Sequence, residues 1–413
     1  MRPTAVVVIG GGQAGLAISH LLTLDGIDHV VLERDSVGAA WRSRWDSFTL
    51  VTPNWTVRLP GAAYGGTDPD GFMPRDEIVA HLQRYAASFG APVRTGVTAT
   101  EVTAIADGGY RVETTAGPLD ARAVVVATGT FQTPRRPALG SLPEGVLDLH
   151  SSAYRNPGAL PPGAVLVVGS GQSGAQIAEE LLEAGRRVFL SVSRAPRIPR
   201  RYRGRDLARW FETMGFVRTV DQLDSPAERF SANAHVSGKR GGHTLNLHRF
   251  ARDGMTLLGR VAEIHGGTIS LVDDLHANLA RADASAAEIR HVVDGFVAQA
   301  GIDAPTPDDE NSDDYAGDDG FHQPRIDRID LASEQVTSVI WSAGYGFDFS
   351  WVRPVALDET GYPVHRRGVT SSPGLYFLGL HFLYTMKSGL LWGVGDDAEY
   401  LAGEIRLHLG TGN

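Results

Sequence analysis

The sequence predicts an α/β fold in which one strand–turn–helix–strand unit occurs twice. In the first copy, an apolar run of β-branched residues at 6–9 is followed by a glycine-rich turn at 10–15. An apolar helix then extends to residue 24, and a second apolar strand follows at 29–32. The same order of segments returns at 165–190. Short apolar runs bounded by glycine predict buried strands, so the repeat indicates two related domains.

Composition and charge narrow the class of protein. The 413 residues are 42% hydrophobic and 21% charged, which is ordinary for a globular chain of two to three domains. No cysteine is present, which excludes disulfides, thiolate metal sites and cysteine nucleophiles. The net charge is −10, but residues 303–322 hold eight acids and no Lys or Arg, so the rest carries only −2. We therefore expect a solvated loop at 303–322 and no nucleic-acid partner.

The uncharged stretch 5–24 resembles a short signal peptide in hydrophobicity alone. Four glycines interrupt it, and no small-residue cleavage site follows. Glycines break an apolar run into strand, turn and helix, so we expect neither a membrane anchor nor a signal segment. The sequence predicts a cytoplasmic protein without a membrane partner.

The first glycine turn has the spacing of a dinucleotide-binding fingerprint. Gly10 permits a tight turn, Gly12 lets a pyrophosphate approach the backbone, and Gly15 lets the helix and strand pack closely. The helix N-terminus offers free N–H groups to the phosphates. Glu33, at the end of the second strand, would accept hydrogen bonds from ribose hydroxyls and repel a 2′-phosphate. A glycine turn of an ordinary α/β protein is the alternative, and it does not require this acid. Further contacts are expected from Gln13, Ala14, Arg34 and Trp41.

The second turn differs from the first in the residues that end its second strand. Gly169, Gly171 and Gly174 repeat the glycine spacing, but Ser193 and Arg194 follow the strand where the first copy has its acid. Hydroxyls and a guanidinium suit a 2′-phosphate, so the sequence predicts NADPH in preference to NADH. Gln172 and Ser173 would contact it at the helix start. Five further arginines are equally compatible with a solvated basic patch: Arg197, Arg200, Arg201, Arg203 and Arg205.

Two dinucleotide sites of different chemistry fit a flavin enzyme, in which FAD lies near a nicotinamide that delivers hydride. The predicted fold is therefore α/β with two Rossmann-like dinucleotide-binding domains, the NADPH domain being inserted in the FAD domain. We expect the FAD domain at 1–160 and 331–413, and the NADPH domain at 161–330 with a helical or lid insertion at about 203–303. Glycine-bearing crossovers are expected at 127–129, which includes Thr128 and Gly129, and at 342–344.

The chain resembles the class B flavin-containing monooxygenases, in particular the bacterial and plant branch with the YUCCA-type enzymes. The resemblance covers almost the whole chain and rests on both glycine motifs, Trp41, the stretch 52–61, both crossovers and the strand 373–379. The family motif Phe-x-Gly-x-x-x-His-x-x-x-Tyr is matched by His150 and Tyr154. Its glycine stands one residue early here and its Phe is missing, a departure that bears on the subclass. Baeyer–Villiger relatives usually carry Trp at the position of Tyr154.

The resemblance implies a reaction and a short list of catalytic residues. NADPH would reduce FAD, dioxygen would add at flavin C4a, and the hydroperoxide would give one oxygen atom to a small-molecule substrate. Asn54 would then donate to the peroxide, although a turn residue after Pro53 is the alternative interpretation. A terminal helix at 387–409, beginning near Leu390, would direct its dipole at the flavin. Gly379 is expected beside the cofactor, and His150 is expected to order the interdomain link.

Two other functions remain compatible with the sequence: an NADPH-dependent flavin reductase that does not oxygenate, and a non-catalytic flavin redox sensor. A thioredoxin reductase-type enzyme needs a cysteine pair and is excluded. No metal is expected, because His235, His243 and His248 lack a tight ligand spacing. Neither the substrate nor the formation of a homo-oligomer can be read from the sequence.

Overall fold

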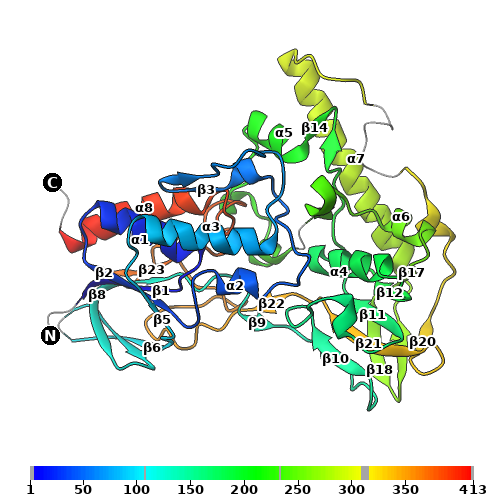
Figure 1. Ribbon diagram of the computed structural model, residues 1–413, viewed down its shortest axis with the longest axis horizontal. Helices are drawn as coiled ribbons and strands as arrows, with labels where there is room; N and C mark the ends of the chain where they lie inside the picture. Colours follow the sequence, from blue (N-terminus) through cyan, green and yellow to red (C-terminus); the bar gives the residue numbers. More distant parts are fainter. Residues whose placement is uncertain (1–3, 107, 232–233, 308–315, 411–413) are drawn as a thin grey trace.

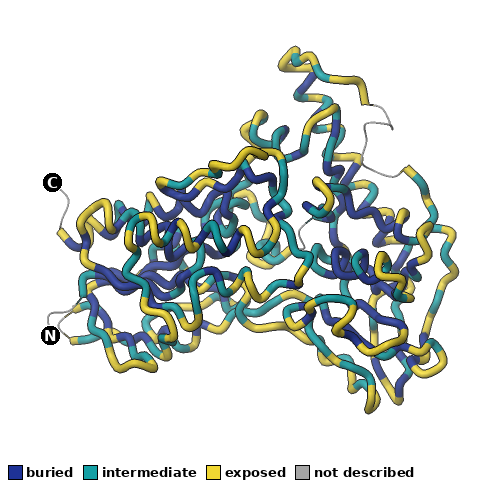
Figure 2. Tube along the Cα trace, in the orientation of Figure 1, coloured by how far each residue is buried: buried dark blue, intermediate teal, exposed yellow. Residues whose placement is uncertain are grey.

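The computed structural model describes residues 4–106, 108–231, 234–307 and 316–410. Figure 1 shows two α/β lobes side by side, one built around β1 and α8 and the other around β11 and α4. The two predicted strand–turn–helix–strand units form the centres of these lobes. Figure 2 shows that the buried residues concentrate along the two sheets and the helices that cover them.

The first sheet has the order β5-β2-β1-β8-β7-β6, with β23 also pairing with β8. Its strands β1, β2, β5, β8 and β23 run parallel to one another. In their register, Val6 stands opposite His29 and Val7 stands opposite Val124. The interior of β1 is fully buried, as expected for a parallel strand that is covered on both faces. Its elements are β1 (Thr4–Ile9), α1 (Gln13–Leu24), β2 (His29–Glu33), α3 (Arg75–Ser88), β5 (Val93–Thr95), β6 (Ala99–Ala104), β7 (Tyr110–Thr114), β8 (Leu119–Val126), β23 (Leu375–Phe377) and α8 (Val394–Leu409).

The second sheet is wholly parallel and has the order β10-β21-β11-β12-β17. Two of its strands, β10 and β21, fall in segments that the sequence assigned to the FAD domain. The predicted boundaries at 160 and 331 are therefore wrong, because each glycine-bearing crossover lies outside these strands: 127–129 precedes β10, and 342–344 follows β21. The elements of this lobe are β10 (Leu147–His150), β11 (Ala164–Val168), α4 (Gln172–Glu183), β12 (Val188–Ser191), β17 (Thr256–Leu258) and β21 (Val336–Trp341).

The span 203–303 is also not one helical insertion, since β17 lies within it and pairs with β12 in the second sheet. A separate antiparallel sheet, β18-β19-β20, draws its third strand from beyond residue 303. The elements here are β13 (Arg201–Tyr202), β14 (Arg205–Asp206), α5 (Leu207–Thr213), η3 (Val220–Gln222), η4 (Pro226–Phe230), β15 (Val236–Ser237), η5 (Lys239–Gly241), β16 (His243–Thr244), α6 (Leu247–Arg252), β18 (Val261–His265), β19 (Thr268–Leu271), α7 (Leu275–Ala300), η6 (Asp319–His322) and β20 (Arg328–Asp330).

The terminal helix α8 begins at Val394, so the predicted start at 387 is wrong. Residues 384–393 form successive turns instead. The Ser388 hydroxyl accepts the backbone N–H groups of Tyr384 and Thr385, a local bond that competes with helix formation. Glycines at 389 and 393 further disfavour a continuous helix.

The two crossovers pair with each other. Short strands β9 (Thr133–Pro134) and β22 (Tyr345–Gly346) form an antiparallel ladder, and Arg135 N–H donates to Gly344 O at 3.0 Å. The chain therefore passes between the lobes as a two-stranded connection, seen between the lobes in Figure 1. The remaining short elements are α2 (Ala39–Arg42), η1 (Asn54–Thr56), β3 (Arg58–Leu59), β4 (Ala62–Ala63) and η2 (Pro157–Ala159).

Two further sequence expectations concern the surface. Residues 303–307 and 316–319 of the acidic stretch are exposed or half-buried, and its centre at 308–315 lies outside the described residues. Among the helices of the described segments, none combines the length and hydrophobicity that a membrane span requires.

Candidate nucleotide sites at the domain junction

The first glycine turn has the geometry that its sequence predicts. Gly10 has a φ of +116°, and a Cβ there would lie 2.4 Å from Ala127 O. A Cβ on Gly15 would lie 1.8 Å from Gly10 O, so both positions require glycine. A Cβ on Gly12 would meet nothing within 4 Å. The start of α1 therefore has open space at Gly12, where a pyrophosphate could approach the backbone, and these residues fit FAD.

The second turn repeats each of these features. Gly169 has a φ of +100°, and its Cβ would lie 2.7 Å from Ser342 O. A Cβ on Gly174 would lie 1.9 Å from Gly169 O, whereas a Cβ on Gly171 would meet nothing within 4 Å. Gln172 and Ser173 form the first turn of α4. This start of α4 has the same room for a second nucleotide.

The residue pairs that brace the two turns differ in charge. Gly11 N–H donates to Glu33 Oε2 at 2.8 Å, and the other carboxylate oxygen accepts Asp35 N–H at 2.9 Å. In the second turn, Ser193 N–H donates to Ser170 Oγ at 2.9 Å. Arg34 and Arg194, the residues predicted to lie beside the two nucleotides, are exposed. The first turn thus carries a carboxylate where the second carries hydroxyls followed by a guanidinium.

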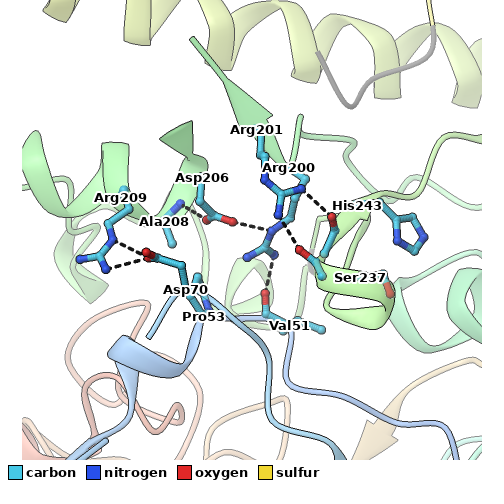
Figure 3. Close-up of polar contacts among 12 residues, drawn as sticks. Val51, Pro53, Asp70, Arg200, Arg201, Asp206, Ala208, Arg209, Ser237 and His243 are labelled. Carbon is cyan, nitrogen blue, oxygen red and sulfur yellow. Dashed lines mark hydrogen bonds and ion pairs between the residues drawn. The ribbon is translucent and has the colours of Figure 1, made fainter. Parts of the chain in front are cut away.

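Four of the five further arginines are engaged within the protein, which favours packing over a solvated patch, whereas Arg205 is exposed and lies over the Trp210 ring. Arg197 binds Asp283 at 2.6 Å, and Arg203 binds Asp294 at 2.6 Å. Arg200 pairs with Asp206 at 2.7 Å and donates to Val51 O at 2.6 Å, across the junction between the lobes (Figure 3). Arg201 donates to Gly242 O at 2.7 Å.

Several residues predicted to bind the first cofactor converge through Gln13. Trp41 Nε1 donates to Gln13 Oε1 at 3.0 Å, and Gln13 Nε2 donates to Gly389 O at 3.3 Å, next to Leu390. Ala14, the next residue, is in close contact with Gly379, where a Cβ would lie 2.6 Å from the Ala14 Cβ. The start of α1 is thereby fixed to α2 and to the turns before α8.

The first crossover also reaches this site. The Thr128 backbone N lies 3.3 Å from the position of a Cβ on Gly10. Gln132 Nε2 donates to Thr128 Oγ1 at 3.1 Å and to Gly129 O at 2.9 Å, which fixes the turn after β8.

Asn54, the predicted catalytic residue, is buried and fully committed to one loop. Its Nδ2 donates to Asp68 O at 2.9 Å, its Oδ1 accepts Met73 N–H at 2.7 Å, and its backbone N–H donates to Gly71 O at 2.8 Å. This geometry favours the alternative interpretation, a structural residue after Pro53. The flavin-facing role stays a prediction.

His150 and Tyr154 occupy the second lobe near the connection. His150 Nε2 lies 3.1 Å from Gly344 O in the second crossover, and burial lowers the pKa of its imidazole. Tyr154 is buried and donates to Glu180 Oε2 at 2.9 Å, and burial raises the pKa of its phenol. His150 therefore orders the crossover, as the sequence indicates.

The sequence did not predict the contact surface between residues 50–72 and 200–242. Gly238 lies against the first lobe so closely that a Cβ would be 1.8 Å from Leu50 O. The Arg200 guanidinium lies 4.3 Å from the centre of the Phe72 ring. Arg209 pairs with Asp70 at 2.8 Å, as Figure 3 shows. No local sequence pattern marks contacts between residues more than a hundred positions apart.

The three histidines that might have suggested a metal have separate partners. His235 hydrogen-bonds to Ser170 O, His243 to Glu179 at 2.6 Å, and His248 to Asp283 at 3.0 Å. Within the described ranges, no group of three or more potential ligand side chains could hold a metal ion.

Comparison with known proteins connects this geometry to a family. Residues 7–210 match the pyridine nucleotide-disulphide oxidoreductase family. An uncharacterized CzcO-like oxidoreductase of Geobacillus kaustophilus is 35% identical over 409 residues, which are 98% of either chain. The rice indole-3-pyruvate monooxygenase YUCCA1 is 34% identical over 191 residues, 45% of this chain and 47% of the relative. The chain belongs to the family of the CzcO-like oxidoreductases, and it is similar to the class B flavin-containing monooxygenases, as the sequence predicts.

Solved structures of other proteins share the fold of this chain. A flavin-containing monooxygenase from Stenotrophomonas maltophilia superposes with a TM-score of 0.67 at 22% identity, covering 98% of this chain and 99% of that one. A bacillithiol disulfide reductase from Bacillus cereus also superposes, with a TM-score of 0.62 at 17% identity over 98% and 99% of the two chains. The predicted two-dinucleotide-binding-domain α/β fold is thus confirmed. The protein is a flavin-dependent oxidoreductase.

Proposed function

We propose that the protein is an FAD- and NADPH-dependent monooxygenase that transfers one oxygen atom from dioxygen to a small-molecule substrate. One observation carries the proposal. Two glycine turns with open space at Gly12 and Gly171 lie at the carboxyl ends of parallel strands in two sheets, joined by a paired crossover, in a chain without cysteine. Ligands of open α/β sheets bind outside these strand ends. Without a dithiol, this chain cannot pass electrons to a disulfide through a cysteine pair of its own.

The first turn would hold FAD. The backbone N–H groups at the start of α1 suit its pyrophosphate, and Glu33 suits the hydroxyls of a ribose without a 2′-phosphate. Gln13, through its hydrogen bonds to Trp41 and to Gly389 O, would hold both next to the cofactor. Bound FAD would accept a hydride from NADPH and activate dioxygen for transfer of one oxygen atom.

The second turn would hold NADPH. Open space at Gly171 accommodates its pyrophosphate, while Ser193 and the exposed Arg194 offer a hydroxyl and a cation to the 2′-phosphate. His235 supports this turn by its hydrogen bond to Ser170 O.

The segment 207–230 supports exclusion of water from the junction. Glu212 of α5 binds Arg58 at 2.8 Å and Lys387 at 3.5 Å, so one carboxylate joins this segment to two parts of the first lobe. Val220 N–H donates to Tyr384 O at 2.8 Å, and Met386 N–H donates to Arg218 O at 2.9 Å. A dry site favours oxygen transfer to the substrate over release of hydrogen peroxide.

The test is isotopic. The holoprotein is incubated with NADPH and ¹⁸O₂ against a panel of sulfides, amines and 2-oxo acids, while NADPH oxidation, peroxide release and ¹⁸O in product are measured. Incorporation of one ¹⁸O atom per turnover is expected with at least one substrate class. Rapid NADPH oxidation with ferricyanide or quinones and no ¹⁸O product would establish the flavin reductase instead. Slow NADPH oxidation with every acceptor would establish the redox sensor.

A further inference from the structure

Arg44 lies in an aromatic cage immediately after α2. Its guanidinium carbon is 4.3 Å from the centre of the Phe131 ring and 5.8 Å from that of Phe48. The Tyr345 phenol also lies beside the guanidinium and opposes the lowering of its pKa by burial. Phe131 and Tyr345 are themselves in edge contact, with ring centres 5.1 Å apart.

The cage joins the carboxyl ends of both sheets. Phe131 follows the end of β8 in the first sheet, and Tyr345 follows the end of β21 in the second. Figure 1 places α2, β9 and β22 together between the lobes. Arg44 N–H donates to Trp41 O at 3.0 Å, and Trp41 binds Gln13 at the start of α1. The guanidinium therefore lies at the junction of the two lobes, close to the start of α1.

The backbone around Arg44 is held firmly. The Arg44 carbonyl accepts Arg75 Nη1 at 3.1 Å, and the preceding carbonyl of Ser43 accepts Arg155 Nη1 at 2.7 Å. Asp46, the nearest acid along the chain, is bound to Arg75 at 2.8 Å and to Asn156 at 2.6 Å. These contacts fix the position of the cage and engage this acid elsewhere.

Arg44 is half-buried, and its charge is incompletely compensated. Within the described part of the chain, its ring and phenol neighbours take the place of a carboxylate. Burial lowers the pKa of its guanidinium, against the opposing effect of Tyr345. Aromatic faces offset only part of the cost of removing a cation from water, whereas an oxyanion would offset much more. A planar guanidinium is also the side chain best suited to bidentate binding of a carboxylate or phosphate.

We propose that Arg44 anchors an oxyanion at the domain junction, either the carboxylate of an acidic substrate or a phosphate of a bound nucleotide. The proposal rests on the proposed function, which places both nucleotides at this junction. Phe131 and Tyr345 orient the guanidinium, so that it faces the oxyanion in one fixed plane. Their position on the two crossovers makes the anchor sensitive to the relative placement of the lobes.

The experiment compares R44Q, R44K and the wild type with R42Q as matched control. Arg42 is exposed in the same segment and donates to Ser36 Oγ at 2.8 Å. Three dissociation constants are measured by calorimetry: FAD with apoprotein, NADP⁺ with holoprotein, and phenylacetate with holoprotein. Phenylacetamide serves as the uncharged counterpart of phenylacetate.

R44Q is expected to weaken the binding of FAD, NADP⁺ or phenylacetate by on the order of tenfold to a hundredfold. R44K should have an intermediate effect, and R42Q should bind all three like the wild type. Loss confined to phenylacetate, with phenylacetamide unaffected, identifies a substrate carboxylate as the oxyanion. Loss confined to NADP⁺ or to FAD identifies a nucleotide phosphate. If all three dissociation constants of R44Q lie within twofold of the wild-type values, the proposal is overturned. A failure of both R44Q and R44K to fold also overturns it. If binding changes but no substrate is oxygenated, the anchor stands and the proposed function falls.

Discussion

The backbone N–H of Gly11 donates a 2.8 Å hydrogen bond to the carboxylate of Glu33. At the corresponding place in the second turn, Ser170 and Ser193 form an uncharged contact of 2.9 Å. The two turns otherwise share their glycine geometry, so the group at the end of the second strand is the main chemical difference between them. A carboxylate repels a 2′-phosphate, whereas hydroxyls can donate hydrogen bonds to it. This difference therefore lets the second turn favour a nucleotide that carries the 2′-phosphate.

Replacement of Arg194 with alanine tests the NADPH assignment. One lost charge-assisted hydrogen bond to the 2′-phosphate would weaken NADPH by on the order of tenfold to a hundredfold. NADH lacks this phosphate, so its Michaelis constant should change little. Steady-state kinetics with both nucleotides measure the effect. Arg205→Ala is the control, because it removes an exposed cation of the same lobe that lies over the Trp210 ring. An equal loss with both nucleotides would contradict the assignment.

Alanine substitutions in the two turns separate the cofactors. Gly12 and Gly171 have negative φ values of −84° and −59° and open space around a Cβ, so alanine is compatible with folding at both. G12A should fold but retain little FAD, because its methyl group occupies the space for the pyrophosphate. G171A should stay yellow and lose affinity for NADPH.

The control is Gly15→Ala, whose Cβ would lie 1.8 Å from Gly10 O and should impair folding itself. Flavin content, melting temperature and the Michaelis constant for NADPH measure the three outcomes. Wild-type flavin content in G12A would show that FAD does not approach the backbone there.

The turns were predictable because each is local. Gly10 and Gly169 need positive φ, and the strand before and helix after them are encoded within a few residues. The domain boundaries were not predictable, because β10 and β21 pair with each other although the paired residues Leu147 and Ser338 are 191 positions apart in the sequence. An apolar strand does not specify its sheet.

The roles of the arginines were likewise beyond the sequence. Arg197 and Arg200 follow the second strand just as Arg194 does, but Asp283 and Asp206 bind them in the fold. Arg44 shows the converse: its cage joins residues from three distant segments, so no spacing marks it. Sequence patterns identified the nucleotide turns, and only tertiary contacts assign the charged side chains around them.

His235 predicts a pH dependence of stability. Burial lowers its pKa to about 4, from an ordinary value of 6.5, while its ring hydrogen-bonds to Ser170 O. Between these values the unfolded chain binds a proton that the folded protein does not. The contribution of His235 to the free energy of unfolding is therefore complete above pH 6.5. It is lost as the pH falls toward 4, at about 1.4 kcal/mol per pH unit.

H235Q keeps an N–H donor for Ser170 but does not titrate. Urea unfolding of the holoprotein at pH 5 and pH 6 should show a pH slope of the unfolding free energy lower than that of the wild type by about 1.4 kcal/mol per unit. His365 and His381, whose pKa values burial also lowers to about 4, should preserve part of the slope. Identical slopes in both proteins would rule out this role for His235.

The role of Asn54 can be determined by measuring the stability and the catalysis of a variant separately. N54A removes the side-chain hydrogen bonds to Asp68 O and Met73 N–H, and burial of Met73 leaves its N–H without a partner. Each unsatisfied group costs about 1–3 kcal/mol, so the variant should unfold at lower urea. The same loop carries Asp70 and Phe72 to the second lobe, so protease cleavage within residues 68–73 should also accelerate.

The matched control for this substitution is T56V, which removes only the local bond from Thr56 Oγ1 to Pro53 O at 2.7 Å. Thr56 lies in the same buried turn but has no hydrogen bond of its own to the 68–73 loop among the contacts of the described residues. T56V should therefore leave cleavage of the loop near the wild-type rate. If N54A instead melts and is cleaved like the wild type while the ratio of oxygenated product to released peroxide falls, the structural interpretation fails. Asn54 would then act on the cofactor, as the family resemblance implies.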